Sequence, residues 1–443
     1  MAENDKKIII LGGGLAGLSA SYHSGFAVYE QHTRPGGTAD SVSQKDYVFD
    51  LGIHVLHSND PNFYQILEDV GAGLITQKRR AWIYSHGGYS TYPFQINTFY
   101  LPRSVRFRCV AGYLLRRNRS KPENYKEWLI QNFGRGFSQT FLIPYAEKFW
   151  RVSPSQMTYE WTSERVPQPR TIDVIKGAFR NQETTLGPNS EFHYPTKHGA
   201  GFAGIAQALA SRINNIHYGM KAKAIDVHNG IITFNEGQEK ITYDFLISTI
   251  PLPELVKLFS HVPSNVHSAV DQLRFNSIAI VNLGVDLPNI SNKHWIYYSE
   301  KDISFFRISF PNNFCKGLSP KGKSLIQAEV SYDLNNSPDR SELLRRVHSD
   351  LVRVGVLEPD HKISFEDVVY LKYGYVIYDH HRKAAVEKIH NYLHSLNIYT
   401  CGRYGDWEYH WSDDAIMSGK RAVEIALQKH KTKSKDNSGQ LVT

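Results

Sequence analysis

Cysteine is scarce in this 443-residue sequence, and its pattern excludes two classes of protein. The three cysteines, Cys109, Cys315 and Cys401, have neither the spacing of a metal site nor the even number of a disulfide framework. We therefore expect buried thiols in a reducing compartment. No apolar run approaches the roughly 18 residues of a membrane-spanning helix, and no basic-apolar leader precedes the first apolar segment. These absences predict a cytoplasmic protein.

Acidic residues are outnumbered, and the chain is basic. Lys and Arg total 51 against 43 Asp and Glu, which gives a formal net charge of +8. The densest cluster lies between residues 103 and 121 and contains Arg103, Arg106, Arg108, Arg116, Arg117, Arg119 and Lys121. Two interpretations stay open: a solvated helical face, or a surface that associates with an anionic membrane or a partner. No nucleic-acid-binding motif is present, so we expect no nucleic-acid partner.

The start of the chain carries a dinucleotide-binding pattern. Four apolar residues, 8–11, predict a buried parallel strand, and Gly12, Gly14 and Gly17 then match the G-x-G-x-x-G turn that opens a helix. The free N–H groups at such a helix N-terminus hold phosphates. A second apolar strand, 26–29, delivers Glu30, whose carboxylate is expected to accept a ribose hydroxyl hydrogen bond.

The step from Gly17 to Glu30 is short, because the acid usually follows the glycines by about 20 residues. We interpret this as a first helix about one turn shorter than usual, ended by the sequence His-Ser-Gly at 23–25. No other acid follows an apolar strand so closely, and Glu30 therefore remains the predicted ribose ligand.

Length and patterning indicate an α/β protein with more than one domain. Hydrophobic residues make up 41% of the chain, as in globular proteins. Alternating apolar residues between 275 and 380 predict an antiparallel sheet, whereas the region from 60 to 190 favours helices. The predicted organisation is a Rossmann-type dinucleotide-binding domain in three parts (1–60, 191–255 and 386–430), a mostly helical cap or substrate insertion (61–190), an antiparallel-sheet substrate domain (256–385) and a disordered tail (431–443).

This order of motifs resembles the two-domain FAD flavoproteins that include amine oxidases, protoporphyrinogen oxidase, phytoene desaturase and UDP-galactopyranose mutase. The resemblance rests on the glycine turn, Glu30, Gly36-Gly37, the strand ending at Thr249 and the block at Gly402-Arg403. It implies FAD as the cofactor. The cofactor-binding residues that it implies are Gly12, Gly14, Leu15, Ala16, Gly17, Glu30, Gln31, Gly36, Gly37, Gly52, Ile53, Thr249, Gly402, Arg403, Asp413, Ala415 and Ile416.

Within this class, the finer resemblance is to UDP-galactopyranose mutase. The segment 52–58, Gly-Ile-His-Val-Leu-His-Ser, is similar to the mutase loop that lies against the flavin. The resemblance implies catalytic roles for Arg165, Arg307 and His54, and substrate-binding roles for Tyr145, Trp150, Tyr375 and Tyr409. Trp411 departs from the mutase pattern, which has a smaller or acidic residue shortly after the last tyrosine. His54 and His57 lack a third metal ligand in the sequence, and no metal is expected.

The residue types in the predicted cleft separate two chemistries. Paired arginines and tyrosine hydroxyls suit a nucleotide diphosphate, because two desolvated phosphates need charged partners. The favoured interpretation is therefore an FAD-dependent mutase that interconverts the pyranose and furanose rings of a UDP-sugar for surface polysaccharide biosynthesis. Its expected partners are the nucleotide sugar, an external reductant such as NAD(P)H, a second copy of the chain in a homodimer, and a membrane or glycan-assembly contact. The alternatives are an FAD oxidoreductase of amine, porphyrinogen or polyene type, and a flavin-binding protein without turnover.

Overall fold

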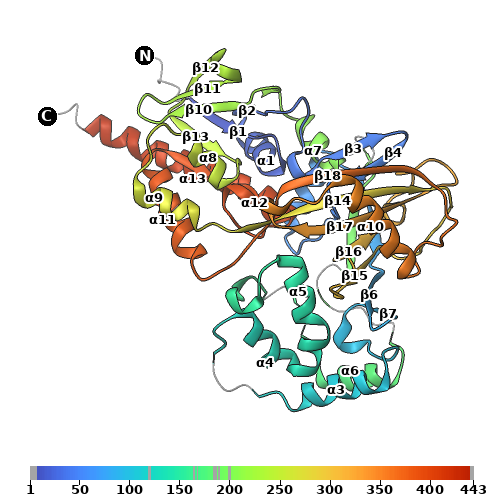
Figure 1. Cartoon of the computed structure of the whole chain (residues 1–443). Coiled ribbons are helices and arrows are strands. Elements are labelled where there is room, and N and C mark those ends of the chain that lie inside the picture. The colour runs from blue at the N-terminus through green and yellow to red at the C-terminus, as the bar shows by residue number, and fades with distance from the viewer. Residues whose placement is uncertain are drawn as a thin grey trace.

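A computed structural model of the chain describes residues 7–117, 121–162, 165–166, 168–182, 187, 190–197 and 201–439, with side chains through 429. Arg119 of the predicted basic cluster lies outside the described residues. Figure 1 shows two sheet-containing parts at one end of the molecule and a lobe of helices at the other. Among the described residues, no helix combines the length and the apolar character needed to cross a bilayer.

The first sheet has five parallel strands that come from distant parts of the chain. Its order is β19 (Ile398–Thr400), β13 (Phe245–Ser248), β1 (Ile8–Leu11), β2 (Ala27–Tyr29) and β9 (Ile216–His217). Side chains of β1 alternate between the faces, as a strand requires. Ile8 and Ile10 pack with helices α1 (Leu15–Ser24) and α13 (Ser412–Gly439), whereas Ile9 and Leu11 belong to the core on the other face.

A three-stranded antiparallel meander contributes to that other face. Its strands are β10 (Ala222–Asp226), β11 (Ile231–Phe234) and β12 (Glu239–Thr242). Ile232 and Phe234 of β11 join the same core as Ile9. The parallel sheet with its helices and meander forms the α/β unit that the sequence predicted, and it presents the carboxyl ends of β1, β2, β13 and β19 at one edge.

The second sheet has seven strands. Its order is β18 (Ile363–Val376), β14 (Phe275–Val285), β17 (Ser324–Tyr332), β16 (Arg307–Ser309), β15 (Trp295–Tyr298), β6 (Ala81–Ser85) and β7 (Gly88–Thr91). All pairs are antiparallel except β15 with β6. Helix α10 (Arg340–Arg353) covers one face, where Val347 and Leu351 pack with alternate residues of β14.

The helical lobe consists of α3 (Arg103–Leu114), α4 (Tyr125–Phe137), α5 (Ile143–Trp150) and α6 (Thr171–Phe179). The region 61–190 is not helical throughout, because β6 and β7 extend the second sheet from within it. Buried and half-exposed residues alternate along β6. The half-exposed positions hold the large aromatic residues Trp82 and Tyr84, so the sequence shows no alternation of apolar and polar residues that would predict a strand.

Shorter elements connect these parts. They are the hairpin β3 (Ser41–Gln44) and β4 (Tyr47–Asp50), the pair β5 (Leu74–Lys78) and β8 (Glu191–Pro195), and helices α2 (Pro61–Asp69), α7 (Ala203–Ala210), α8 (Leu252–Lys257), α9 (Ser264–Asp271), α11 (Arg382–Ser395) and α12 (Gly402–Gly405). Helix α13 continues to Gly439, over most of the tail that was expected to be disordered. Lysine-rich sequence has good helix propensity and can extend a helix that is already packed.

Candidate active site and cofactor cradle

A cavity of about 1020 Å³ begins at the carboxyl edge of the parallel sheet and extends between the second sheet and the helical lobe. Its volume lies at the upper end of the range for small-molecule sites. One end is lined by residues that directly follow β1, β2 and β13, which is where open α/β sheets bind ligands. The other end is lined by aromatic and arginine side chains.

The glycine turn after β1 shapes the first end of the cavity. Gly12 has a φ of +101°, and a Cβ there would overlap the hydroxyl of Thr249. A Cβ at Gly17 would overlap the Gly12 carbonyl oxygen, so this glycine lets α1 approach the turn. Gly14 lines the cavity and precedes α1 without a side-chain cap, which leaves first-turn N–H groups available to a phosphate. These residues fit a dinucleotide.

Glu30 follows β2 and is 4% exposed. Its Oε2 accepts a hydrogen bond from Gly13 N at 2.6 Å, and its Oε1 accepts one from His32 N at 2.8 Å. Each carboxylate oxygen retains a further lone pair, so the group can still accept from a ribose hydroxyl. Helix α1 ends at Ser24, and Gly25 follows with a φ of 74°. This confirms the predicted early end of the helix.

Most of the predicted cofactor residues line this cavity. They are Gly12, Gly14, Leu15, Ala16, Glu30, Gln31, Gly36, Gly37, Ile53, Thr249, Gly402, Arg403 and Ala415. The other four, Gly17, Gly52, Asp413 and Ile416, do not line it. Gly17 lies behind Gly12, and the Ile416 side chain is fully buried in a core that includes Leu15 and Leu18. Burial raises the pKa of Asp413, beside the cavity.

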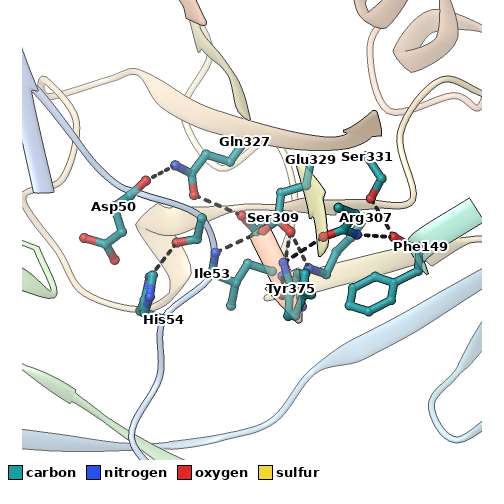
Figure 2. Close-up of polar contacts among 12 residues, drawn as sticks. Asp50, Ile53, His54, Phe149, Arg307, Ser309, Gln327, Glu329, Ser331 and Tyr375 are labelled. Atoms are coloured by element: carbon teal, nitrogen blue, oxygen red, sulfur yellow. Dashed lines mark hydrogen bonds and ion pairs between the residues drawn. The ribbon is translucent and has the colours of Figure 1, made fainter. Parts of the chain in front are cut away.

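The loop 51–58 follows Asp50, and hydrogen bonds to this residue anchor the start of the loop. Asp50 at the end of β4 accepts hydrogen bonds from Ser41 Oγ, Tyr194 OH and Phe202 N, at 2.6 to 2.8 Å. Its carbonyl accepts from Gln327 Nε2 at 2.6 Å (Figure 2). A buried carboxylate with three donors holds its position firmly, although burial raises its pKa. The loop therefore leaves β4 in a fixed direction.

His54 lies on this loop and faces the cavity. Its ring lies 5.0 Å from that of Phe202, and its Nδ1 lies 3.3 Å from the Gly52 carbonyl oxygen. Burial lowers the pKa of His54 from 6.5 to about 4, in spite of the Gly52 carbonyl. The imidazole is therefore neutral near pH 7. Among the described residues, neither His54 nor His57 belongs to a group of three metal ligands.

The lowered pKa of His54 predicts an acid-dependent loss of stability. As pH falls below 6.5 the unfolded chain binds a proton here, whereas the folded chain does not until about pH 4. The free energy of unfolding should therefore fall by up to about 3 kcal/mol between these pH values. His54→Gln should reduce this fall in urea titrations at about pH 7 and about pH 4.5, and the exposed control His267→Gln should not. An equal pH dependence of the free energy of unfolding in both variants would contradict a lowered pKa for His54 in the folded protein.

Arginine and tyrosine side chains alternate along the far end of the cavity. Arg165 lies over the ring of Tyr409 at 4.8 Å, and Arg403 contacts the adjacent rings of Tyr409 and Tyr375 at 4.9 and 4.7 Å. Arg307 Nη2 donates to Tyr375 OH at 3.4 Å. The three cations come from the segment before α6, from α12 and from β16, so the fold brings together residues that are far apart in the sequence.

Arg307 is held by a buried carboxylate. Its Nη2 and Nε donate to Glu329 Oε2 at 2.6 and 3.2 Å, and Glu329 Oε1 accepts from Ile53 N at 3.0 Å (Figure 2). Burial is the largest single influence and lowers the pKa of Arg307, but Glu329 acting together with Tyr375, Tyr297 and Tyr145 outweighs it, and the pKa is raised well above its ordinary value. One carboxylate thus fixes both the arginine and the loop that carries His54.

Arg165 is oriented by groups of the chain itself. It lies between the rings of Tyr409 and Trp411, at 4.8 Å from each centroid. Its Nη2 donates to the Tyr409 carbonyl at 2.6 Å and lies 3.4 Å from Asp414 Oδ2. Trp411, the departure noted in the sequence, therefore supplies a second aromatic ring that contacts this cation.

Tyr145 and Trp150, the predicted substrate residues on α5, belong to an aromatic lining. Tyr145 stacks between Phe141 and Phe149 with centroids 5.4 and 5.9 Å away. Trp150 is 2% exposed and contacts Tyr375 and Tyr409 edge-on, both at 5.9 Å. Trp150 lines the cavity together with Tyr145, Tyr375 and Tyr409, and its ring packs against the last two.

Two further residues of the site were missed in the sequence. Arg79 is 6% exposed, lines the cavity and lies over the ring of Tyr92 at 4.6 Å, but it sits in a Lys-Arg-Arg run that is typical of an exposed turn. Glu329 is 2% exposed within an otherwise uncharged strand. A lone acid in a buried strand is a detectable signal, because it requires a partner.

Comparison with known proteins relates this geometry to flavoenzymes. The family model described as flavin containing amine oxidoreductase matches residues 15–427. A structure of reduced UDP-galactopyranose mutase is similar with a TM-score of 0.90 and 28% identity, and the match covers 96% of each chain. A putative protoporphyrinogen oxidase from Exiguobacterium sp. 255-15 is similar with a TM-score of 0.74 and 17% identity, covering 96% of this chain and 100% of that one. A redesigned putrescine oxidase is similar with a TM-score of 0.67 and 12% identity, and the match covers 96% of this chain and 99% of that one.

Proposed function

This chain belongs to the family of flavin-containing amine oxidoreductases, within which we propose that it acts as a nucleotide-sugar mutase. It is a flavoprotein, and its cofactor is FAD. The proposed reaction interconverts the pyranose and furanose forms of a UDP-sugar, of which UDP-galactose is the first candidate, for surface polysaccharide biosynthesis. The similarity to UDP-galactopyranose mutase over 96% of both chains supports this proposal.

The observation that carries the proposal is the row of Arg165, Arg403 and Arg307, interleaved with Tyr409 and Tyr375 beside the cofactor cradle. Three guanidinium groups in one partly desolvated cavity attract a diphosphate strongly. The same cations would repel the ammonium group of an amine substrate. An anionic substrate therefore fits the site better than an amine does.

The side chains of the site would hold the nucleoside diphosphate in place while the sugar ring rearranges. Arginine donors neutralise charge on the departing diphosphate, an electrostatic role that needs no movement of the protein. Burial raises the pKa of Tyr375, which keeps its hydroxyl protonated and able to donate to a phosphate oxygen. Neutral His54 adds no positive charge on the cofactor side. When bound and reduced, FAD supplies an electron-rich ring system that can act on the anomeric carbon.

The aromatic lining supports the rest of the substrate. Tyr92, Phe94, Phe141 and Tyr145 provide apolar surface for a nucleobase and for the hydrophobic face of a sugar. The same lining also suits a large planar substrate, and the fold shared with the putative protoporphyrinogen oxidase keeps a net oxidoreductase as the second candidate.

The deciding experiment measures turnover with reduced and oxidised enzyme. FAD-loaded protein, reduced by dithionite under anaerobic conditions, is incubated with UDP-galactopyranose and with other UDP-sugars, and furanose product is quantified by chromatography. We expect product only with reduced enzyme, because the reaction has no net electron transfer but requires reduced FAD. Bleaching of the flavin absorbance by NADPH or NADH tests the proposed source of electrons.

The oxidoreductase alternative has a separate readout. Oxidised enzyme is given amines or a porphyrinogen in air, and hydrogen peroxide is measured. Peroxide that depends on one of these substrates, together with no furanose product from any nucleotide sugar, would replace the mutase by an oxidase.

A further inference from the structure

Exposed apolar side chains are concentrated on one part of the helical lobe. Of the twelve large apolar residues that are exposed among those described, seven lie on α3, on α6 or on the segments that flank α3. These are Phe99, Tyr100, Phe107, Leu114, Leu115, Ile172 and Phe179, and together we call them the α3–α6 surface. Phe107 and Leu115 are each 77% exposed, and Phe179 is 74% exposed. Clusters of this kind on a folded chain mark interaction sites.

The packing of α3 explains why these residues face outward. Arg103, Phe107 and Leu114 are spaced four and seven residues apart and share the exposed side of the helix. Val105 and Cys109 lie on the buried side. Helix α6 is held alongside, because Arg106 Nη1 donates to the Ala178 carbonyl at 2.8 Å. Figure 1 shows α3 and α6 at the tip of the lobe, at the opposite end of the molecule from the meander β10–β12.

The same surface is strongly basic. The sequence contains no Asp or Glu from residue 70 to residue 122. The exposed cations on or beside the surface are Arg103, Arg108, Arg117, Lys121, Arg170, Lys176 and Arg180. The one acid on α6, Asp173, is paired with Arg170 at 2.8 Å. The surface therefore combines protruding apolar side chains with a surplus of positive charge.

We propose that the α3–α6 surface binds the face of an anionic lipid bilayer. Its aromatic and aliphatic side chains would enter the boundary between headgroups and acyl chains, while the surrounding arginines and lysines contact anionic headgroups. The chain would lie on the bilayer and would not span it, in keeping with the absence of an apolar spanning helix among the described residues.

Two other occupants fit the surface less well. A second copy docked through the same surface would bring two clusters of arginine together, because a twofold interface pairs identical patches. Nucleic acid would be attracted by the charge, and a base could stack on Phe107 or Phe179, but the aliphatic Leu114, Leu115 and Ile172 would remain exposed to water in such a complex. An anionic bilayer satisfies both the charge and the aliphatic groups.

The surface is separate from the catalytic cavity, since no residue of α3 or α6 lines that cavity. Binding to lipid can therefore be removed without removing turnover. This separation makes the inference independent of the proposed mutase activity.

The test is vesicle co-sedimentation of the full-length, FAD-loaded protein. Vesicles contain phosphatidylcholine alone or phosphatidylcholine with phosphatidylglycerol. We expect binding at least about tenfold stronger to the anionic vesicles, and weaker binding at high salt. Phe107→Ser with Leu115→Ser should abolish sedimentation with the charges unchanged. Arg103→Gln with Arg117→Gln should reduce it about tenfold or more, because each basic residue near an anionic surface adds to the attraction.

Matched controls use exposed positions elsewhere. Leu334→Ser replaces an exposed apolar residue, and Arg345→Gln with Arg346→Gln neutralises two exposed arginines of α10. These variants should bind vesicles like the wild type, and all variants should retain their flavin. The inference is overturned if the wild type binds neither kind of vesicle, or if the controls lose binding as much as the surface variants do. It is also overturned if the wild type is a dimer that binds no vesicles and Phe107→Ser with Leu115→Ser makes it a monomer. A final contrary result is that RNA displaces the protein from the vesicles.

Discussion

Arg307→Ala is expected to lower kcat/KM for the proposed nucleotide-sugar substrate by about 10²–10³, which is typical when a preorganised charge-stabilising donor is removed. The guanidinium is fixed toward the cavity by two hydrogen bonds from one side of its fork to Glu329 Oε2, so it needs no reorientation when a diphosphate arrives. The alanine also leaves Glu329, which is 2% exposed, without its ion pair. Loss of one partner of a buried pair costs roughly 3–5 kcal/mol of stability. The variant should therefore lose both turnover and thermal stability.

These two losses can be separated by companion variants. Arg307→Lys keeps the charge but not the fork, and we expect turnover between those of wild type and Arg307→Ala. Replacing both partners, in Arg307→Met with Glu329→Leu, should recover part of the stability without recovering turnover, because paired removal leaves no unpartnered buried charge. Arg340→Gln, which breaks an exposed ion pair with Asp367, is the control and should change neither. Near-normal UDP binding by Arg307→Ala would remove Arg307 from the diphosphate site.

The cofactor end of the site was predictable because its signals are local in the sequence. Strand, glycine turn, short helix and Glu30 all lie within the first 30 residues, and each is dictated by chain geometry over a few positions. Even the unusual spacing to Glu30 had a local cause, since Gly25 adopts a left-handed conformation and ends α1 at Ser24. The resemblance to flavoenzymes then added the strand ending at Thr249 and the block at Gly402-Arg403, and the structure places β13 and β19 before them, on one side of β1.

The substrate end could be predicted only in part, because its contacts span long distances along the chain. Nothing near Arg307 shows that Glu329 lies opposite it, 22 residues later and on the neighbouring strand. Arg79 is disguised by its basic neighbours, and its burial depends on the packing of β6 into the second sheet, which helical patterning did not anticipate. Trp411 could be identified as a departure, but its contact with Arg165 is visible only in three dimensions.

Gly14→Ala is expected to remove FAD from a protein that otherwise folds normally. Gly14 has a φ of −77° and a ψ of 178°, which alanine adopts readily, and its Cβ would meet nothing of the chain nearer than 3.8 Å. The methyl would instead project from a residue that lines the cofactor cradle. A methyl forced into a filled site costs about 1–3 kcal/mol, which is one to two orders of magnitude in the Kd for FAD.

The ratio of flavin to protein after purification and the melting temperature with and without added FAD are the two measurements that check this expectation. The apoprotein of Gly14→Ala should melt like wild-type apoprotein, but the stabilisation by FAD should shrink, because that stabilisation follows the affinity. Gly17→Ala should behave differently, since its Cβ would overlap the Gly12 carbonyl and the turn itself would be damaged in both states. Gly88→Ala, in a strand away from the cavity and with its nearest contact at 3.6 Å, should retain full flavin content. If Gly14→Ala instead purified with full flavin while its apoprotein melted early, Gly14 would serve the fold and the phosphates would lie elsewhere in the cavity.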